Sequence, residues 1–235
     1  MSINRSLPQR SLQKAGITVK SKGLFIVLEG MDGSGKTSQL EHIKRYLNEQ
    51  GIDFLSTREP GGISVSEQIR EVILNVDNHM SGLTECLLYA SARREHLIQK
   101  VIPALNDGRI VICDRYVMSS LAYQGYGREL GKAVLDINQL AIDVDGQQYW
   151  ADMNIYIDVK PEVGLERIMS KSGEREVNRL DLETLEFHHR VHKGYMELSE
   201  QHAEQFVMIN GEQDEDSVFG DIKQVLDQLI QEYRV

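Results

Sequence analysis

The sequence predicts a three-layer α/β fold, in which a five-stranded parallel sheet is covered by helices on both faces. Two observations carry this prediction. From residue 24 onward, short apolar runs alternate with segments whose apolar residues recur every three or four positions, and strands separated by helices in this way form parallel sheets. A glycine-rich turn stands between the first strand and the first helix. No repeat or linker divides the chain, so we expect one domain over residues 23–235.

The five expected strands are the short apolar runs. The first precedes the glycine-rich turn, the second follows Gly51, and the third is polar only at Arg109, where it begins. The strands are predicted at residues 24–29, 52–55, 109–113, 153–159 and 206–209.

The expected helices are the segments with helical spacing. Leu40, Ile43 and Leu47 define the first, which Gly51 ends, and Pro161 suits the first turn of a later one. Helices are predicted at residues 36–50, 64–75, 82–104, twice within 116–145, from 161, up to about 203, and at 214–233. Charged residues at about 171–181 interrupt this pattern.

The glycine-rich turn matches the pattern G-x-x-x-x-G-K-[ST] between a strand and a helix, which is the context of a phosphate-binding P-loop. Its backbone N–H groups and the helix N-terminus would hold phosphates, so the sequence predicts ATP binding. Lys36 would pair with the β- and γ-phosphates, and Thr37 would bind Mg²⁺. The predicted ATP-binding residues are Gly30, Met31, Asp32, Gly33, Ser34, Gly35, Lys36, Thr37 and Ser38.

Two further strands end in an arginine. Thr57-Arg58-Glu59-Pro60-Gly61-Gly62 follows the second strand, and Asp114-Arg115-Tyr116 follows the third. Ligands of parallel sheets bind at the carboxyl ends of the strands. A guanidinium group grips phosphate with two hydrogen bonds. Arg58 and Arg115 therefore predict a second anion beside the P-loop.

The composition narrows the function classes. The net charge of −10 argues against a surface that coats nucleic acid. No apolar stretch reaches membrane-spanning length. Cys86 and Cys113 lie in apolar patterns and are expected to be buried thiols of a reducing compartment. We therefore expect a cytoplasmic protein with neither nucleic acid nor membrane as partner.

Residues 1–22 differ from the rest of the chain, because they carry five basic residues and no acidic one. This bias is typical of an organelle transit peptide, but the apolar residues form no helical face. We expect a basic, disordered extension without a role in the chemistry, and organelle targeting is the alternative.

Four motifs together make the chain similar to the thymidylate kinases of the bacterial type, within the nucleoside monophosphate kinase group. The motifs are E-G-x-D-G-x-G-K-T, T-R-E-P-G-G, D-R-Y-x-x-S-S-x-A-Y-Q-G and P-E-V-G-L, and the resemblance covers about residues 24–233. It implies transfer of the γ-phosphoryl group from ATP to dTMP, which gives dTDP and ADP in dTTP biosynthesis, with Mg²⁺ and a homodimer. The helices at 64–75 and 82–104 are candidates for the dimer contact.

The resemblance also assigns roles at the dTMP site. It places Asp32 at the 3′-hydroxyl group, Arg58 and Arg115 at the monophosphate, and Asp114 near Mg²⁺. Tyr89 would stack on thymine, where phenylalanine is usual, and Arg93 would bind its O4. The other implied contacts are Ser119 or Ser120 at N3, Tyr123 under the sugar with Gln124 beside it, and Tyr195 closing over the nucleotide.

The P-loop contains no arginine to stabilise the transferring phosphoryl group, whereas part of the family has one there. The charged residues at about 171–181 resemble the small lid segment of the family, and this lid is the expected source of the charge. Arg179 aligns best with the family's lid arginine, and Arg175 is the second candidate. Asn178 stands where aspartate is common.

Two alternatives stay open at this point. The acceptor could be dUMP or another pyrimidine deoxynucleoside monophosphate. In a different class of function, the same fold could serve as a non-catalytic nucleotide sensor. A sensor would need no second anion site, so the arginines favour the kinase.

Overall fold

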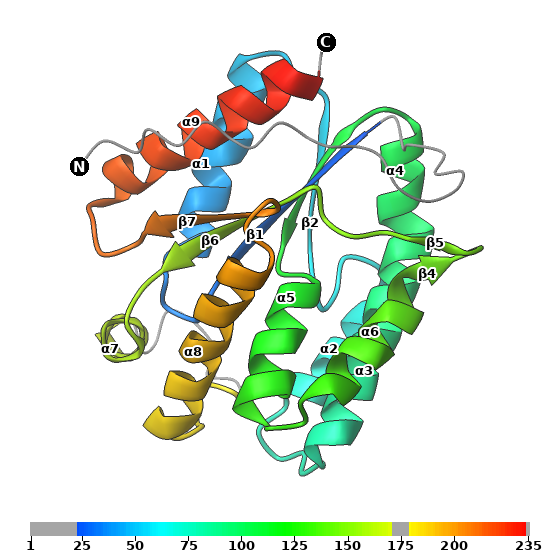
Figure 1. The fold of residues 1–235 in the computed structure, drawn as a ribbon, viewed down its shortest axis with the longest axis vertical. Coiled ribbons are helices and arrows are strands. Elements are labelled where there is room, and N and C mark those ends of the chain that lie inside the picture. The colour runs from blue at the N-terminus through cyan, green and yellow to red at the C-terminus, as the bar shows by residue number, and fades with distance from the viewer. Residues whose placement is uncertain (1–22, 171–178, 234–235) are drawn as a thin grey trace.

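The computed structural model describes residues 23–170 and 179–233, in which helices cover both faces of a central sheet (Figure 1). The sheet has five parallel strands in the order β2-β3-β1-β6-β7. Their bounds are β1 (Leu24–Gly30), β2 (Phe54–Arg58), β3 (Ile110–Asp114), β6 (Met153–Asp158) and β7 (Phe206–Asn210). The predicted three-layer fold is confirmed.

Side chains of β1 alternate between two hydrophobic cores. Leu24, Ile26 and Leu28 pack against α1 (Lys36–Glu49) and α9 (Glu215–Tyr233). Phe25 and Val27 face the opposite core. The helices that supply this second core are α3 (Gly82–His96), η1 (Leu97–Val101), α4 (Ile102–Asn106), α5 (Val117–Ser120), η2 (Leu121–Gly127), α6 (Lys132–Ile142) and α8 (Leu185–Gln201).

Two strands lie further along the chain than predicted. The second was expected at residues 52–55 and runs from Phe54 to Arg58, and the third begins at Ile110 rather than residue 109. Arg58 pairs with Asp114 in the register of β2 and β3. The prediction followed apolar side chains, whereas backbone hydrogen bonds extend a strand through polar residues.

Helical structure within 116–145 is also shorter than predicted. It breaks after Gly127 as expected, but α6 ends at Ile142. The chain then forms a small hairpin of β4 (Asp143–Val144) and β5 (Gln147–Gln148). Asp145 and Gly146, with φ of 53° and 82°, form its turn, and Asp-Gly is a preferred sequence for such a turn. The helix expected at 82–104 continues to Asn106, because Pro103 lies in the first turn of α4, where proline is tolerated.

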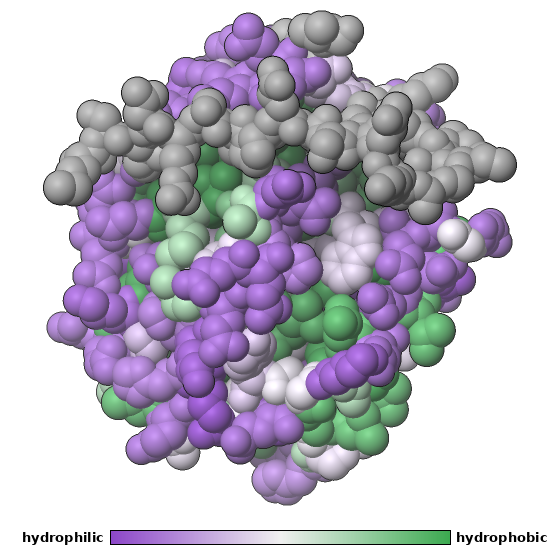
Figure 2. Space-filling model, viewed as in Figure 1, coloured by the Kyte–Doolittle hydropathy of each residue, from purple (hydrophilic) through white to green (hydrophobic). Residues whose placement is uncertain are grey.

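Two remaining helices frame the site: α2 (Ser64–Leu74) and α7, which begins at Pro161 as predicted and ends at Ser170. Both cysteines are buried and free, as predicted. No helix within the described residues is both long and apolar enough to cross a membrane. Hydrophilic residues cover most of the face seen in Figure 2. The N-terminal extension and residues 171–178 of the expected lid lie outside the described residues.

Candidate active site

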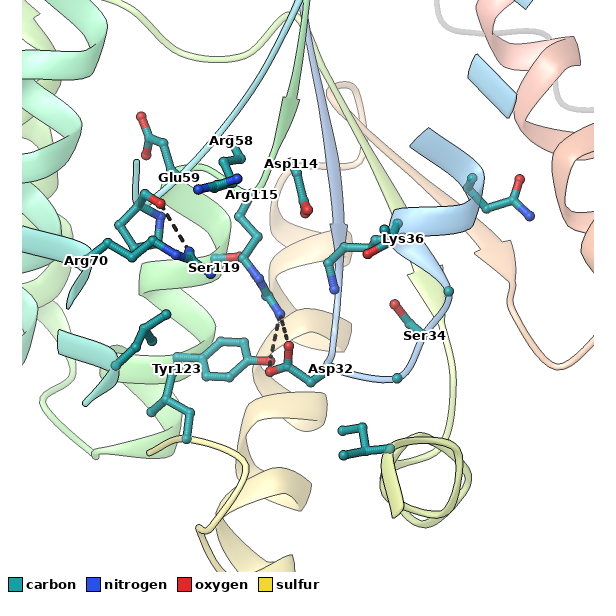
Figure 3. A pocket seen from close by; sticks show the side chains of 18 of the residues that line it. Asp32, Ser34, Lys36, Arg58, Glu59, Arg70, Asp114, Arg115, Ser119 and Tyr123 are labelled. Atoms are coloured by element: carbon teal, nitrogen blue, oxygen red, sulfur yellow. Dashed lines mark hydrogen bonds and ion pairs between the residues drawn. The ribbon is translucent and has the colours of Figure 1, made fainter. Parts of the chain in front are cut away.

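A large cavity occupies the predicted position, at the carboxyl ends of β1, β2 and β3. Its volume is about 1260 Å³, above the range of roughly 300–1,000 Å³ that is common for one small ligand. The P-loop lines one part of it, and Arg58 and Arg115 line the part beside β2 and β3 (Figure 3). Arg93 lines the same cavity. This arrangement gives two zones for anionic ligands within one cavity.

The P-loop curves between β1 and α1 as its glycines allow. Gly33 and Gly35 have φ values of 77° and 97°, in the region that favours glycine. The side chain of Lys36 folds back over the loop, where Nζ donates hydrogen bonds to the carbonyl oxygens of Gly30 (3.0 Å) and Met31 (2.9 Å). The lysine that is expected to bind phosphate therefore also stabilises the loop itself.

Burial changes the protonation of Lys36. The side chain is only 7% exposed, and this desolvation, together with the nearby Arg115, lowers its pKa to about 8. Asp114, Asp32 and Glu29 oppose the shift. A bound polyphosphate would add negative charge next to Nζ and favour the charged ammonium.

ATP binding is consequently expected to take up protons in alkaline solution. At a pH of about 9, Lys36 is mostly neutral before ATP binds. The negative charge of the bound phosphates favours the ammonium form, so we expect an uptake from solution of roughly 0.5–1 proton per ATP bound. Calorimetric titrations in buffers of different ionisation enthalpy measure this number. The Lys36→Met variant serves as the control and should show almost no uptake. An equal uptake in both proteins would assign the proton to another group.

Helix α7 supports the P-loop through a close contact between two glycines. A Cβ atom on Gly33 would lie 2.1 Å from the carbonyl oxygen of Gly164, and one on Gly164 would lie 2.7 Å from that of Asp32. Arg167 of the same helix donates to the carbonyl oxygens of Gly33 (3.4 Å) and Gly211 (3.0 Å). The glycine of the P-E-V-G-L motif is therefore required by close backbone packing.

Oxygen ligands suited to Mg²⁺ stand beside the P-loop. Asp114 and Thr37 both line the cavity. Among the described residues, the buried Oδ1 atom of Asp114 has no hydrogen-bond partner, which fits an oxygen reserved for a ligand. Carboxylate and hydroxyl oxygens are typical Mg²⁺ ligands, so these two residues fit the predicted metal role.

Arg115 connects the P-loop to the helix that follows β3. Its Nη1 atom donates to the carbonyl oxygen of Gly30 (3.0 Å) and to Ser119 Oγ (3.2 Å). Its Nη2 atom donates to Asp32 Oδ1 (2.9 Å), and Tyr123 donates to the other oxygen of Asp32 (3.1 Å), as Figure 3 shows. The backbone φ of Arg115 is 69°, a value that costs energy for a residue other than glycine and often marks functional positions.

Glu29 is a residue of this site to which the sequence analysis assigned no role. It is fully buried at the end of β1. Its Oε1 atom accepts the backbone N–H groups of Tyr116 (3.0 Å) and Ser119 (3.2 Å), and Oε2 accepts the hydroxyl groups of Ser119 (2.6 Å) and Tyr195 (2.9 Å). A side chain of β1 thereby caps the N-terminus of α5. Burial raises the pKa of Glu29 against these hydrogen bonds.

Arg93 lies at the cavity wall, and its guanidinium group is largely committed to the protein. Nε donates to Glu59 (2.7 Å), Nη1 to Ser120 (3.1 Å) and Asn138, and Nη2 to the carbonyl oxygen of Tyr116 (2.9 Å). Within the described contacts, one of the five N–H groups is left for a ligand. Removing Arg93 would leave Glu59 buried without this partner, a loss that typically costs about 3–5 kcal/mol. The Arg93→Ala variant would therefore lose stability as well as any contact with the base, so a change in its base preference would not report on that contact alone.

The anion zone beside β2 and β3 contains one arginine, Arg70, that the sequence analysis missed. Arg58 is half exposed and bonds Glu67 through Nη2 at 2.8 and 3.0 Å. Arg70 of α2 lies beside it, lines the cavity and donates to the carbonyl oxygen of Pro60 (3.1 Å). Burial and the neighbouring Arg58 lower the pKa of Arg70. Arg70 belongs to no recognised motif and no apolar pattern, so only the packing of α2 reveals it.

Most of the predicted site residues line this cavity. They are Asp32, Gly33, Ser34, Gly35, Lys36, Thr37, Ser38, Arg58, Tyr89, Arg93, Asp114, Arg115, Ser119, Ser120, Tyr123 and Gln124. Their individual roles stay predictions. Gly30 and Met31 contribute the carbonyl oxygens that hold Lys36.

Tyr195 and Arg179 are not among the described residues that line this cavity. Tyr195 was expected over the nucleotide, but it is fully buried and stacks on Tyr156, with ring centroids 4.5 Å apart. The side chain of Arg179 bonds Glu85 and the carbonyl oxygen of Ile73 (3.1 Å). Arg175 lies outside the described residues.

Comparisons with known proteins agree on one group. A family model described as thymidylate kinase matches residues 28–222. The chain is 54% identical over 205 residues to a thymidylate kinase of Clostridium novyi (strain NT), covering 86% of this chain and 98% of that protein. It is 47% identical over 211 residues to a thymidylate kinase of Geobacillus sp. (strain WCH70), covering 88% and 98%. The crystal structure of thymidylate kinase from Ehrlichia chaffeensis is similar, with a TM-score of 0.69 and 30% identity, covering 87% of this chain and 98% of that one.

Proposed function

The chain belongs to the thymidylate kinase family, and we propose that its cavity binds ATP at the P-loop and dTMP at the arginines of β2, β3 and α2. The reaction is the transfer of the γ-phosphoryl group of ATP to dTMP, which gives dTDP and ADP for dTTP synthesis. The acceptor phosphate is already an anion, so the transfer needs no general base. The protein contributes position and positive charge.

One observation carries the proposal: two cationic zones share a single cavity. Lys36 and the P-loop form the first. Arg58, Arg70 and Arg115 surround the second. A sensor of one nucleoside triphosphate needs a single anion site. Two sites facing each other bring together two polyanions that would otherwise repel, as phosphoryl transfer requires.

On the donor side, Lys36 would exchange its bonds to Gly30 and Met31 for phosphate oxygens. Thr37 and Asp114 would hold Mg²⁺, which supplies charge neutralisation at the phosphates when it is bound. The P-loop offers no arginine, so we propose that Arg175 or Arg179 adds the further cation. Arg179 can do so only by leaving Glu85, to which it is bonded here.

On the acceptor side, Tyr89 and Arg93 would receive the base and Asp32 would receive the sugar. The hydroxyl group of Tyr123 bonds Asp32, and this pair would fill the space that a 2′-hydroxyl group needs. Ser120 and Gln124 line the wall near Arg93. These roles rest on the family resemblance and on the placement of the residues in one cavity.

A coupled assay of ADP release tests the proposal. We expect rapid turnover with dTMP and ATP, and much slower turnover with dUMP or dCMP at the same concentration. Faster turnover with dUMP or another pyrimidine deoxynucleoside monophosphate would indicate a paralogous kinase. ATP binding without ADP release for any monophosphate would favour the sensor.

We also propose a homodimer that uses α2 and α3. Both helices expose large apolar side chains. Clusters of such side chains are uncommon on the surface of a monomer. These residues are Val65, Val72, Leu83 and Leu87. Sedimentation analysis should give about twice the mass of one chain, and a Leu83→Lys, Leu87→Lys variant should give the mass of a monomer.

A further inference from the structure

Glu85 is a buried carboxylate that the proposed reaction does not use. It lies in the first turn of α3, has no exposed surface, and is absent from the described lining of the cavity. A charge in this position is costly unless hydrogen-bond donors surround it. Glu85 therefore needs several hydrogen-bond donors from neighbouring segments.

Three side chains from two segments supply the donors. Gln124 Nε2 donates to Oε1 (2.7 Å), Arg128 donates to both oxygens (3.0 and 3.4 Å), and Arg179 donates to Oε2. Two guanidinium groups pair with this carboxylate. An ionised carboxylate only accepts hydrogen bonds. Gln124 must therefore present its amide nitrogen to Glu85, so its carbonyl oxygen points the other way.

The two helices around Glu85 form one wall of the cavity. Glu85, Tyr89 and Arg93 are successive residues of one face of α3, four positions apart. Opposite them, Gln124 contacts Glu85 and Ser120 contacts Arg93. Tyr89 lies between these two contacts and lines the cavity, as Gln124 and Arg93 do. The wall therefore offers an N–H donor at Arg93 and a carbonyl acceptor at Gln124.

We propose that Glu85 is a positioning residue that sets base selectivity by fixing the orientation of the Gln124 amide. The inference rests on the proposed function, because it places the base of the acceptor against this wall. Thymine has an acceptor, O4, next to a donor, N3–H, and this pair complements the wall. Cytosine has an amino donor and an acceptor at the same positions. A site built for one arrangement rejects the other because its polar groups stay unpaired.

The variant Glu85→Gln tests this role. The two arginines would take the single oxygen of the new amide, which leaves its N–H₂ group facing Gln124. Gln124 would then turn its own carbonyl toward residue 85 and its N–H₂ group toward the base. We expect the ratio of kcat/KM for dTMP over dCMP to fall at least ~10-fold. Loss of stability alone would lower both values together and leave the ratio unchanged.

Glu183→Gln is the matched control. Glu183 bonds Arg128 at 2.6 Å but is not a partner of Gln124, so the ratio should stay at the wild-type value. If Glu85→Gln does not fold, Glu85→Asp replaces it. Aspartate keeps the negative charge that pairs with the arginines, but its side chain is one methylene shorter. It should therefore lose the hydrogen bond to Gln124 and also lower the ratio of kcat/KM for dTMP over dCMP.

Combining Glu85→Gln with Gln124→Met tests whether Glu85 acts through Gln124. Glu85 acts through Gln124, so Gln124→Met should lower the ratio by itself, and adding Glu85→Gln should change it no further. An unchanged ratio in a folded Glu85 variant, or a further drop in the double variant, overturns the inference. A wild-type enzyme that does not phosphorylate dTMP would instead refute the proposed function.

Discussion

Lys36→Met is expected to lower kcat for dTMP phosphorylation by about 10³-fold while the protein stays folded. The ammonium group is the cation that the P-loop itself brings to the phosphates, and positioned charges of this kind are typically worth two or more orders of magnitude in rate. Among the described residues, Nζ bonds the carbonyl oxygens of Gly30 and Met31. Methionine fills a similar volume, so the surrounding packing should survive.

The measurement is kcat at saturating ATP and dTMP, together with the free energy of unfolding in denaturant. Lys44→Met is the matched control, because Lys44 lies on the same helix and pairs only with Glu41 near the surface. It should keep wild-type kcat. A kcat within tenfold of wild type for Lys36→Met would remove this lysine from the chemistry, since tenfold corresponds to about 1.4 kcal/mol.

Arg115→Met is expected to lower kcat/KM for dTMP by about 10²–10³-fold. The guanidinium group joins the P-loop to α5 through Gly30, Asp32 and Ser119. Its loss removes a cation between the two phosphate zones and also takes one partner from the carboxylate of Asp32. Arg115→Lys should recover little of the activity, because an ammonium group cannot reproduce the planar fork that makes these contacts.

Arg109→Met is the matched control for this test. Arg109 immediately precedes the same strand, at its opposite end, where it pairs with the exposed Asp53 (3.1 Å). Its replacement should leave kcat/KM unchanged. Equal losses for Arg109→Met and Arg115→Met would mean that the effect comes from β3 as a whole, and the proposed role of Arg115 would be wrong.

The sheet was predictable because local patterns specify it. Each strand of the sheet is a short apolar run, and parallel pairing follows from the helices between them. The hairpin after α6 was missed because Ile142 and Val144 continue an apolar pattern that does not reveal the Asp145–Gly146 turn within it. The strand ends were placed too early where polar residues such as Thr57 and Arg58 continue the ladder.

For the site, the sequence by itself determined the parts whose chemistry is local. A glycine pattern specifies the P-loop, because backbone conformation and spacing decide where its N–H groups and Lys36 lie. Arg58 and Arg115 were found because they directly follow strands, and the carboxyl ends of parallel strands meet at one edge.

Only the tertiary structure decided the partners that come from distant segments. Glu29 caps a helix nearly 90 positions away, Arg179 bonds Glu85 across 94 positions, and the fully buried Tyr195 bonds Glu29 across 166 positions. The cause is the cost of burying charge: Glu29 and Glu85 each need several donors, and the packing of whole helices determines which donors can reach them. No spacing along the chain encodes that choice, since it depends on which faces of α3, α5 and α8 meet.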